Sequence, residues 1–562
     1  MTHRISLTGF AKAAFAVGIC STVVSGAICE AQSPTPTAQV DDEKRIDVGS
    51  EDGASRDISR YEDLVEHTRN VASQPGAPRE ELPLSLARLN YDAYRMIAFR
   101  YERALWWNQN RPFWLEFFHR GFVHRDRVSI NILPRKGENG SAVSGADSAE
   151  PVTIPFDRGM FEYRGPTANM VLPTDIGYAG YKVIGRFPGD PSGQEMLTFL
   201  GASYFRSRSG ATGYGTSARG LAVNPAATEE FPVFREFWIR DPDANDRTFT
   251  TLALMDSPSV AGAYEFTLTP GAVDTTVSVK CTLFFRDAAA KAGIAPLTSM
   301  WMWGDGLEGP PKDARPSVHD ADGLQILDDD KWTWRALSRQ SYPSLTSVPV
   351  KSLEGFGLMQ RERRWSRYQD DEARYHQRPS VWIEPKSPWQ GGTIELFEMP
   401  AIHEGHDNIV CYWVPPERPK PLEPIELDYD VHFFAGSQPA SHKSLAKVAR
   451  TDVVRRADGL LEFQVTFSRP RKVPEPAERQ DDPPPEIEAT SIRGEVIERS
   501  VTASDPLTWK VSLIVRPTSA DEPVELSMNL QRDGTRIAET WSYLAAQAPP
   551  PYKYPQVYTR QD

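Results

Sequence analysis

The chain has 562 residues, of which 40% are hydrophobic and 25% charged, and its formal net charge at pH 7 is −13. These proportions are typical of folded globular proteins and the length favours two domains, which excludes a chain that is disordered throughout or that crosses a membrane many times. The acidic balance also argues against nucleic-acid binding, because displacing counterions from phosphates requires a basic face.

Residues 1–31 are predicted to be a secretory signal peptide. Arg4 supplies a positive charge, the run from Leu7 to Val24 is largely apolar, and small residues follow up to a cleavage site near Ala31. Lys12 and the small residues make this run a poor permanent anchor. We therefore expect an exported protein.

The next segment, residues 32–78, is polar and rich in Ser, Pro, Asp and Glu, which indicates a loose lead-in. Order is expected to begin with a helical stretch from Leu84 to Trp107, where apolar residues recur at helix-like intervals. From about residue 113 to residue 435, short alternating runs punctuated by Gly and Pro dominate the sequence. This pattern predicts a large antiparallel β-sandwich over residues 79–436, whose loops carry the functional residues. Gly137–Pro151 is one such loop by composition.

The alternating run Ile425–Phe433 is expected to close this first domain, and a second set of strands begins at Leu461. Asp533-Gly534 is a hairpin signal, and the segment from Ile537 to Tyr543 supplies the return strand. Roughly a hundred residues of such strands predict an immunoglobulin-like sandwich. We therefore predict an all-β protein with a connector and this smaller sandwich in residues 437–562. Pro470–Pro485 is a charged, Pro-rich loop of that domain.

Two cysteines, Cys281 and Cys411, remain beyond the predicted cleavage site. An oxidising compartment would allow them to form one disulfide, but two separate buried thiols fit the sequence equally well.

Several common catalytic motifs are missing from the sequence, among them the Gly-x-Ser-x-Gly elbow, the P-loop and the dinucleotide fingerprint. His403, His406 and Asp407 lie close together, but the histidines are three residues apart and Gly405 favours a loop. Zinc ligands on a helix need a spacing of four, so we predict no metal site and no cofactor.

Paired carboxylates are the better indication of chemistry. Glycoside hydrolysis needs one carboxylic acid to protonate the leaving oxygen and a second carboxylate to attack or to activate water. Most loop aspartates only stabilise turns or caps, so composition by itself leaves the choice open. The loop candidates are Asp256, Asp305, Asp320, Asp322, Asp370, Asp371 and Asp407.

Ordered sequence blocks from about residue 80 to residue 545 resemble the OpgG/OpgD (MdoG) family of periplasmic glucan proteins. Several blocks are six or more residues long, and they occur in the family's order. They include Phe199-Leu-Gly-Ala-Ser-Tyr-Phe-Arg206, Tyr214-Gly-Thr-Ser-Ala-Arg-Gly-Leu-Ala222, Arg315-Pro316, His319-Asp320, Arg378-Pro-Ser380, Asp407-Asn-Ile-Val410 and Glu539-Thr-Trp-Ser-Tyr543.

This resemblance implies a galactose-mutarotase-like sandwich with a glycan cleft, an immunoglobulin-like second domain, and periplasmic β-1,2-glucan as substrate. It also implies that Asp407 is the general acid and that Asp320 is the general base, acting through water. Asp322, two residues further on, is the rival base. The predicted sugar contacts from the matched blocks are Tyr204, Arg206, Tyr214, Arg219, Arg315 and His319, although Tyr204 and Tyr214 fit a core position equally well.

Three interpretations of function follow from the resemblance. The chain is an inverting endo-β-1,2-glucanase, an inverting transglycosylase that remodels or cyclises the glucan, or a non-catalytic glucan-binding scaffold beside a membrane glucan glycosyltransferase. The presence of both Asp320 and Asp407 favours an enzyme, which is expected to be a monomer or homodimer. His403-Glu-Gly-His406 departs from the family's pattern and leaves the balance between hydrolysis and transfer open.

Overall fold

The computed structural model describes residues 58–134, 150–287, 291–401, 403–442, 445–470, 484–519 and 521–546. The predicted signal peptide and most of the predicted loops Gly137–Pro151 and Pro470–Pro485 lie outside these residues. Within them, strands dominate, and none of the helices is both long enough and apolar enough to span a bilayer.

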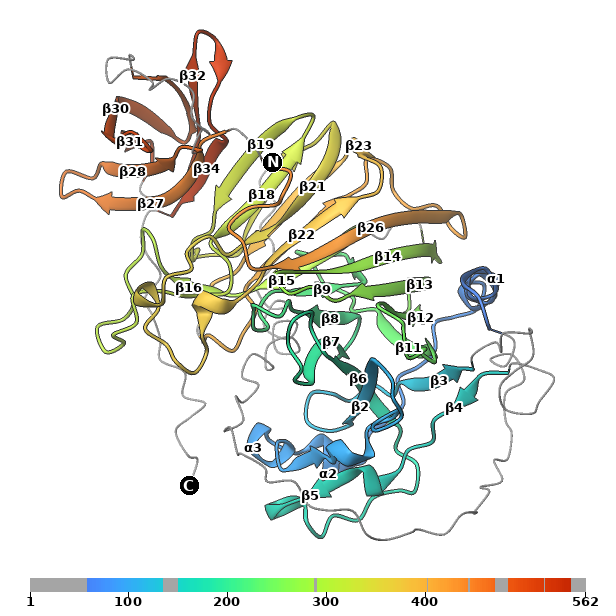
Figure 1. Cartoon of the computed structure of the whole chain (residues 1–562). Helices are drawn as coiled ribbons and strands as arrows, with labels where there is room; N and C mark the ends of the chain where they lie inside the picture. The colour runs from blue at the N-terminus through green and yellow to red at the C-terminus, as the bar shows by residue number, and fades with distance from the viewer. Residues whose placement is uncertain are drawn as a thin grey trace.

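The large domain is a sandwich of two facing sheets (Figure 1). The first sheet has the order β2-β6-β7-β8-β9-β15-β25-β24-β20, with β10 paired to β15. Its strands are β2 (Phe113–His119), β6 (Tyr178–Gly185), β7 (Gln194–Leu200), β8 (Tyr204–Ser207), β9 (Ser217–Arg219), β10 (Leu221–Val223), β15 (Ala292–Ser299), β20 (Ser344–Pro349), β24 (Thr393–Glu398) and β25 (Ile409–Val414).

The second sheet faces the first across an aromatic core that includes Phe199, Phe205, Phe237 and Phe266. In the large domain it runs through β19 (Lys331–Ala336), β18 (Gly323–Asp328), β21 (Ser352–Met359), β22 (Ser380–Pro385), β26 (Pro424–Phe434), β14 (Asp274–Phe285), β13 (Val260–Thr269), β12 (Phe249–Asp256), β11 (Val233–Arg240), β3 (Ser129–Leu133) and β4 (Val152–Thr153), with β23 (Trp389–Gln390) beside β21.

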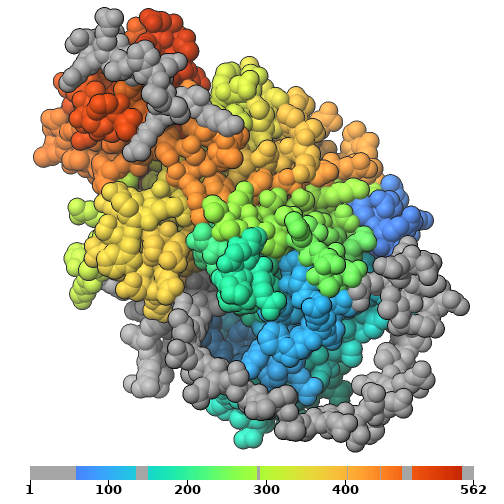
Figure 2. Space-filling model, viewed as in Figure 1, coloured from blue at the N-terminus to red at the C-terminus, as the bar shows by residue number. Residues whose placement is uncertain are grey.

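The C-terminal domain is a smaller sandwich at one end of the molecule (Figures 1 and 2). One of its sheets has the order β27 (Lys447–Arg455), β28 (Leu461–Ser468), β31 (Thr508–Pro517), β30 (Gly494–Asp505). The facing strands are β29 (Glu486–Ile492), β32 (Val524–Arg532), β33 (Thr535–Arg536) and β34 (Thr540–Ala545). Because β34 pairs in parallel with β19, the second sheet of the large domain continues into this sandwich. The all-β prediction with two sandwiches is confirmed.

Glu539, just before β34, is the centre of a buried polar network between the domains. Its carboxylate accepts hydrogen bonds from Arg361 Nη1 at 2.6 Å, Gln325 Nε2 at 3.0 Å and the Val448 N–H at 2.6 Å, and lies 3.3 Å from His442 Nε2. Burial opposes ionisation, but Arg361 and His442 hold the pKa of Glu539 down at about 2. The ionised carboxylate is therefore fully partnered.

Replacing Glu539 with Ala is expected to lower the free energy of unfolding by about 3–5 kcal/mol, because Arg361 is then left buried without its partner. Urea denaturation at pH 7 measures the change. Glu486→Ala, at an exposed position of β29, is the control and should stay within about 0.5 kcal/mol of wild type. Equal stability of the two variants would contradict a structural role for the network.

The predicted helix from Leu84 to Trp107 is wrong. The structure has two short helices, α2 (Leu84–Ala87) and α3 (Tyr91–Tyr94), followed by β1 (Ile97–Phe99) and the 3₁₀ turn η3 (Tyr101–Arg103). Asn90 caps α3 by accepting the Ala93 N–H at 2.9 Å, and β1 pairs with β5 (Phe161–Tyr163). Capping and strand pairing thus override the apolar periodicity.

The lead-in prediction also needs correction, because its described part contains α1 (Tyr61–Ala72). Tyr61 and Leu64 are buried against Trp238 and Leu252 of the second sheet. The spacing of Tyr61, Leu64 and Ala72 was the available signal, but the polar residues between them obscured it.

The remaining short elements lie in the loops: 3₁₀ turns η4 (Arg158–Met160), η5 (Gly165–Thr167), η6 (Trp365–Arg367) and η7 (Tyr375–Gln377), and the strand pair β16 (Trp301–Trp303) and β17 (Val318–His319). Cys281 on β14 and Cys411 on β25 are free, buried thiols in different sheets. Of the two alternatives for these cysteines, the separate thiols are therefore the one found.

Candidate active site

The end of β15 holds the loop that carries Asp407. The Asn408 N–H donates to the Ser299 carbonyl at 3.0 Å. The Asn408 side chain accepts the Trp301 N–H at 2.8 Å and donates to the Trp301 carbonyl at 3.0 Å. Asn408 therefore acts as a clamp that fixes its neighbour Asp407 beside this strand end.

The same strand end also holds Asp320. The Asp320 N–H donates to the Met300 carbonyl at 2.9 Å, and His319 pairs with Trp301 between β17 and β16. The two predicted catalytic aspartates are thus anchored on consecutive residues of one segment, although 407 − 320 = 87 positions separate them in the sequence.

Strands β8 and β9 present Tyr204, Arg206 and Arg219 on one face of the first sheet. Phe205 and Ala218, the residues that alternate with them, lie in the sandwich core. Tyr204 is paired directly with Arg219 across the two strands, so all three polar side chains share the opposite face.

Electrostatic interactions connect these side chains to both aspartates. Burial raises the pKa of Asp407 to about 6, and the nearby negative charge of Asp320 adds to this rise, while Arg206 and Arg219 oppose it. Burial also raises the pKa of Asp320, which is only 2% exposed, while Arg378 and Arg206 favour its ionised form. The two carboxylates therefore share one electrostatic environment with Arg206.

The two aspartates differ in their nearest partner. Arg378 Nε lies 3.4 Å from Asp320 Oδ1 and forms an ion pair with it. Because two neighbouring carboxylates resist ionising together, this pair favours Asp320 as the ionised member and Asp407 as the protonated one. A protonated and an ionised carboxyl group side by side can perform general acid and general base catalysis.

Arg219 is held by one ion pair and two aromatic rings. It is buried, Nη2 donates to Glu229 Oε1 at 2.6 Å, and the guanidinium lies 5.0 Å from the ring centre of Tyr204 and 4.9 Å from that of Phe231. The buried Tyr204 hydroxyl, by contrast, has no hydrogen-bond partner among the described residues. Tyr204 thus lacks the satisfied hydroxyl of an ordinary core tyrosine, and contact between this buried oxygen and a sugar stays a prediction.

Tyr214 lies beside the same group. Its hydroxyl is 3.2 Å from Thr198 Oγ1, and its carbonyl accepts a hydrogen bond from Arg378, the partner of Asp320. The structure thus brings together Tyr204, Arg206, Tyr214, Arg219, Asp320 and Asp407.

Arg315 and His319 have other partners. Arg315 is engaged by the carboxylates of Asp313, Asp370 and Glu404. The His319 ring lies flat against Trp301, with ring centres 6.2 Å apart, and its Nδ1 is 3.1 Å from Gln360 Oε1. Direct sugar contact by either side chain stays a prediction, and Arg315 would have to give up a carboxylate to make it.

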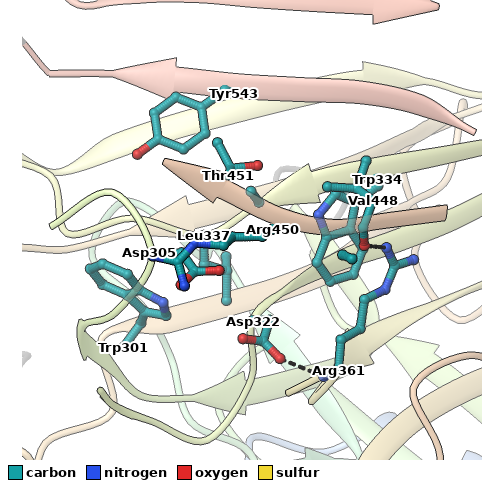
Figure 3. Close-up of a pocket in the computed structure, with 12 residues that line it drawn as sticks. Trp301, Asp305, Asp322, Trp334, Leu337, Arg361, Val448, Arg450, Thr451 and Tyr543 are labelled. Atoms are coloured by element: carbon teal, nitrogen blue, oxygen red, sulfur yellow. Dashed lines mark hydrogen bonds and ion pairs between the residues drawn. The ribbon is translucent and has the colours of Figure 1, made fainter. Parts of the chain in front are cut away.

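Asp322 faces a different region from Asp320. It borders a cavity of about 30 Å³ between the two domains, which Figure 3 shows with Asp305 and Arg450 on its other sides. Asp322 Oδ2 accepts the backbone N–H groups of Arg361 and Glu362. These hydrogen bonds to the backbone explain the presence of an aspartate at position 322 without a catalytic role. Asp320 has no such explanation.

Burial raises the pKa of Asp322 to about 6. A carboxyl group whose pKa is higher in the folded than in the unfolded chain stabilises the fold at low pH, and this contribution is lost as pH rises through about 6. We expect Asp322→Asn to be more stable than wild type by about 1–3 kcal/mol at pH 8 and equal to it near pH 4, as measured by urea denaturation. Asp92→Asn, the same change at an exposed position, is the control. A less stable Asp322→Asn at pH 8 would show that the ionised carboxylate is needed.

Three members of the site were not predicted from the sequence: Arg378, Tyr375 and Glu404. Arg378 begins one of the matched sequence blocks, which was the available signal for it. Tyr375 lies in a segment without a motif, whereas Glu404 lies in His403-Glu-Gly-His406, whose departure from the family's pattern was the available signal. Only the fold brings the two together. In the described part of the chain, no group of three or more His, Cys, Asp or Glu side chains is arranged to hold a metal ion.

Comparisons with known proteins identify a family for this chain. A model of the family described as "Periplasmic glucan biosynthesis protein, MdoG" matches residues 60–545. Glucans biosynthesis protein G of Pseudomonas aeruginosa strain LESB58 is 35% identical over 499 residues, which cover 86% of this chain and 92% of the relative. The protein of the same name from Ralstonia nicotianae is 36% identical over 494 residues, with coverage of 86% and 95%. Among solved structures, the galactosidase domain of an α-galactosidase-sucrose kinase overlaps 39% of this chain and 30% of its own, with 8% identity and a TM-score of 0.23.

Proposed function

The chain belongs to the MdoG family of periplasmic glucan biosynthesis proteins, and from this premise we propose that it is a periplasmic enzyme that cleaves linear β-1,2-glucan with inversion at the anomeric carbon. Asp407 is the general acid in this proposal and Asp320 is the general base.

The pKa of Asp407, raised by burial to about 6, is the observation that carries the proposal. A general acid must be protonated when the substrate binds, and an ordinary aspartate is ionised near neutral pH. The raised pKa extends the pH range in which Asp407 holds its proton up to about pH 6, and this proton passes to the glycosidic oxygen as the bond to the leaving sugar breaks.

Asp320 has the environment expected of the base. Its ion pair with Arg378 at 3.4 Å favours the carboxylate form, which takes a proton from water as that water attacks the anomeric carbon. Inversion requires room for the water between the two carboxyl groups, which in inverting enzymes are about 6.5–9.5 Å apart. A relay of waters is compatible with an even longer separation.

Tyr204 and Arg206 are the proposed sugar contacts nearest to this pair. The unpartnered hydroxyl of Tyr204 can accept or donate a hydrogen bond to a sugar hydroxyl, and Arg206 lies close enough to influence both aspartates. Arg219 holds Tyr204 in place from behind, since its own Nη2 is occupied by Glu229.

The burial of Asp320 favours a second candidate function, an inverting transglycosylase. With only 2% of Asp320 exposed, few waters reach the base, so a sugar hydroxyl held in an acceptor subsite can compete with water for the anomeric carbon.

Incubation of the purified protein with linear β-1,2-glucan tests these functions, with β-1,3- and β-1,4-glucans as linkage controls. Shorter β-1,2 chains indicate hydrolysis, whereas longer or cyclic products of the same linkage indicate transfer. Binding of the glucan without any change in chain length would contradict an enzyme and favour a scaffold.

A further inference from the structure

The loop between β24 and β25 carries Asp407. Near its tip, the loop is hydrogen-bonded to Arg315 and Tyr375, which lie in two other segments of the site. The loop is closed at its base by the Met399 N–H, which donates to the Asn408 carbonyl at 2.9 Å. A turn from His403 to His406 forms the tip, where the His406 N–H donates to the His403 carbonyl at 3.1 Å. Glu404 lies within this turn, three residues before Asp407.

Glu404 joins the loop to two other segments. Its Oε2 accepts hydrogen bonds from Arg315 Nη1 and from the Tyr375 hydroxyl, both at 2.8 Å. Arg315 Nη2 also reaches Oε1 at 3.4 Å. Charge-assisted hydrogen bonds of this kind are stronger than neutral ones, so Glu404 binds the tip of the loop firmly to Arg315 and Tyr375.

Arg315 binds three carboxylates, of which Glu404 is one. A guanidinium has five N–H donors, and in Arg315 all three nitrogens donate to carboxylates. Asp313 binds Nε and Nη2, Asp370 binds Nη1, and the ring of Trp303 lies 5.6 Å below the guanidinium. Arg315 thus keeps two carboxylate partners if Glu404 is removed, so its other contacts should survive.

Tyr375 continues the connection to the base. Arg378 lies 5.3 Å from the ring centre of Tyr375, and its Nε is 3.4 Å from Asp320. Gln360 fixes the Tyr375 backbone, because its Nε2 donates to the Tyr375 carbonyl at 3.0 Å. The loop of the acid is therefore joined, through Glu404 and Tyr375, to the side chains that surround the base.

We propose that Glu404 is a positioning residue of the reaction: by binding Arg315 and Tyr375 it latches the loop so that Asp407 faces Asp320. This inference rests on the proposed function for its catalytic consequence, but the latch itself is a property of the loop. Displacing a catalytic group by about 1 Å can cost about 10²-fold in rate, so a latched loop matters to the chemistry.

The latch lies nearer to solvent than the base does. The Glu404 side chain is 36% exposed, whereas Asp320 is 2% exposed, so the contact that closes the loop lies where water can replace it.

Hydrogen–deuterium exchange of the intact protein tests the latch without substrate. In Glu404→Ala, amides of the loop between β24 and β25 should exchange at least about 10-fold faster than in wild type, because the tip has lost its partners. Glu372→Ala is the matched control, since Glu372 is an exposed carboxylate near Tyr375 in the sequence. Equal exchange in all three proteins would overturn the latch, whether or not the enzyme is active on glucan.

Kinetics on linear β-1,2-glucan test the positioning role. Glu404→Ala should lower kcat by about 10- to 100-fold with a much smaller change in KM, whereas Glu404→Asp should recover part of the loss. Glu404→Gln keeps an acceptor for Tyr375 but removes the negative charge that raises the pKa of Asp320, so the acidic limb of its pH profile should move to lower pH. Wild-type kcat and an unmoved profile in these variants, with wild type active, would overturn the positioning role and leave the proposed function intact.

Discussion

Replacing Asp407 with Asn is expected to lower kcat on linear β-1,2-glucan by about 10²–10⁴-fold, because the leaving alkoxide is a strong base that must be protonated as it departs. Asn has the size of Asp but no proton of suitable acidity. Since burial already raises the pKa of Asp407 to about 6, the variant should be at least as stable as wild type near neutral pH.

A substrate with an acidic leaving group separates this role from others. The phenol of an aryl β-glucoside can leave without protonation. The activity of Asp407→Asn on such a substrate should therefore fall much less than its activity on the glucan. In wild type, kcat/KM on glucan should fall as pH rises through about 6, where Asp407 loses its proton. An Asn variant that keeps half of the wild-type activity on glucan would remove Asp407 from the role of acid.

Replacing Asp320 with Asn is expected to cause a comparable loss, also about 10²–10⁴-fold, because the variant lacks the carboxylate beside Arg378 that accepts the proton of the attacking water. The loss should persist on the aryl glucoside, since the base is needed whatever the leaving group. This difference between the two substrates distinguishes base from acid.

Asp322→Asn is the matched control for Asp320→Asn, because the same chemical change is made two residues away in the cavity between the domains. We expect it to retain activity. Loss of activity in Asp322→Asn alone would make Asp322 the base. Nuclear magnetic resonance of fresh products should show the inverted anomer at the new reducing end, and retention of configuration would contradict the inverting mechanism.

The interdomain network and the catalytic pair show why similar residues have opposite ionisation. Glu539 is fully buried, yet its pKa is lowered to about 2, because Arg361 and His442 lie against it. Asp407 is next to arginines too, but burial and the charge of Asp320 outweigh them and raise its pKa. Direct pairing stabilises the charge of Glu539, whereas the arginines near Asp407 do not offset its burial, so its pKa stays raised.

Local pattern in the sequence was sufficient for most strands. The alternation from Val277 to Leu283 lies within β14, and that from Ile425 to Phe433 lies within β26, because a strand buried on one face must alternate apolar and polar residues. The same reasoning failed for Leu84–Trp107, where short-range capping and the pairing of β1 with β5 decided the structure. It also overlooked α1, whose buried face is only a few residues wide.

The sequence by itself determined the all-β class and the blocks that contain Asp320, Asp407 and the polar residues of β8 and β9. It did not place Asp320 near Asp407, because the two are 87 positions apart and sequence separation gives no distance in space. In the structure, both are anchored by hydrogen bonds to the segment Ser299–Trp301. Nor did it separate Asp320 from Asp322, since two residues of one type in one turn look alike in a sequence. Only the tertiary structure places Asp320 beside Arg378 and Asp322 against the backbone of Arg361. Those surroundings determine the pKa of each carboxyl group.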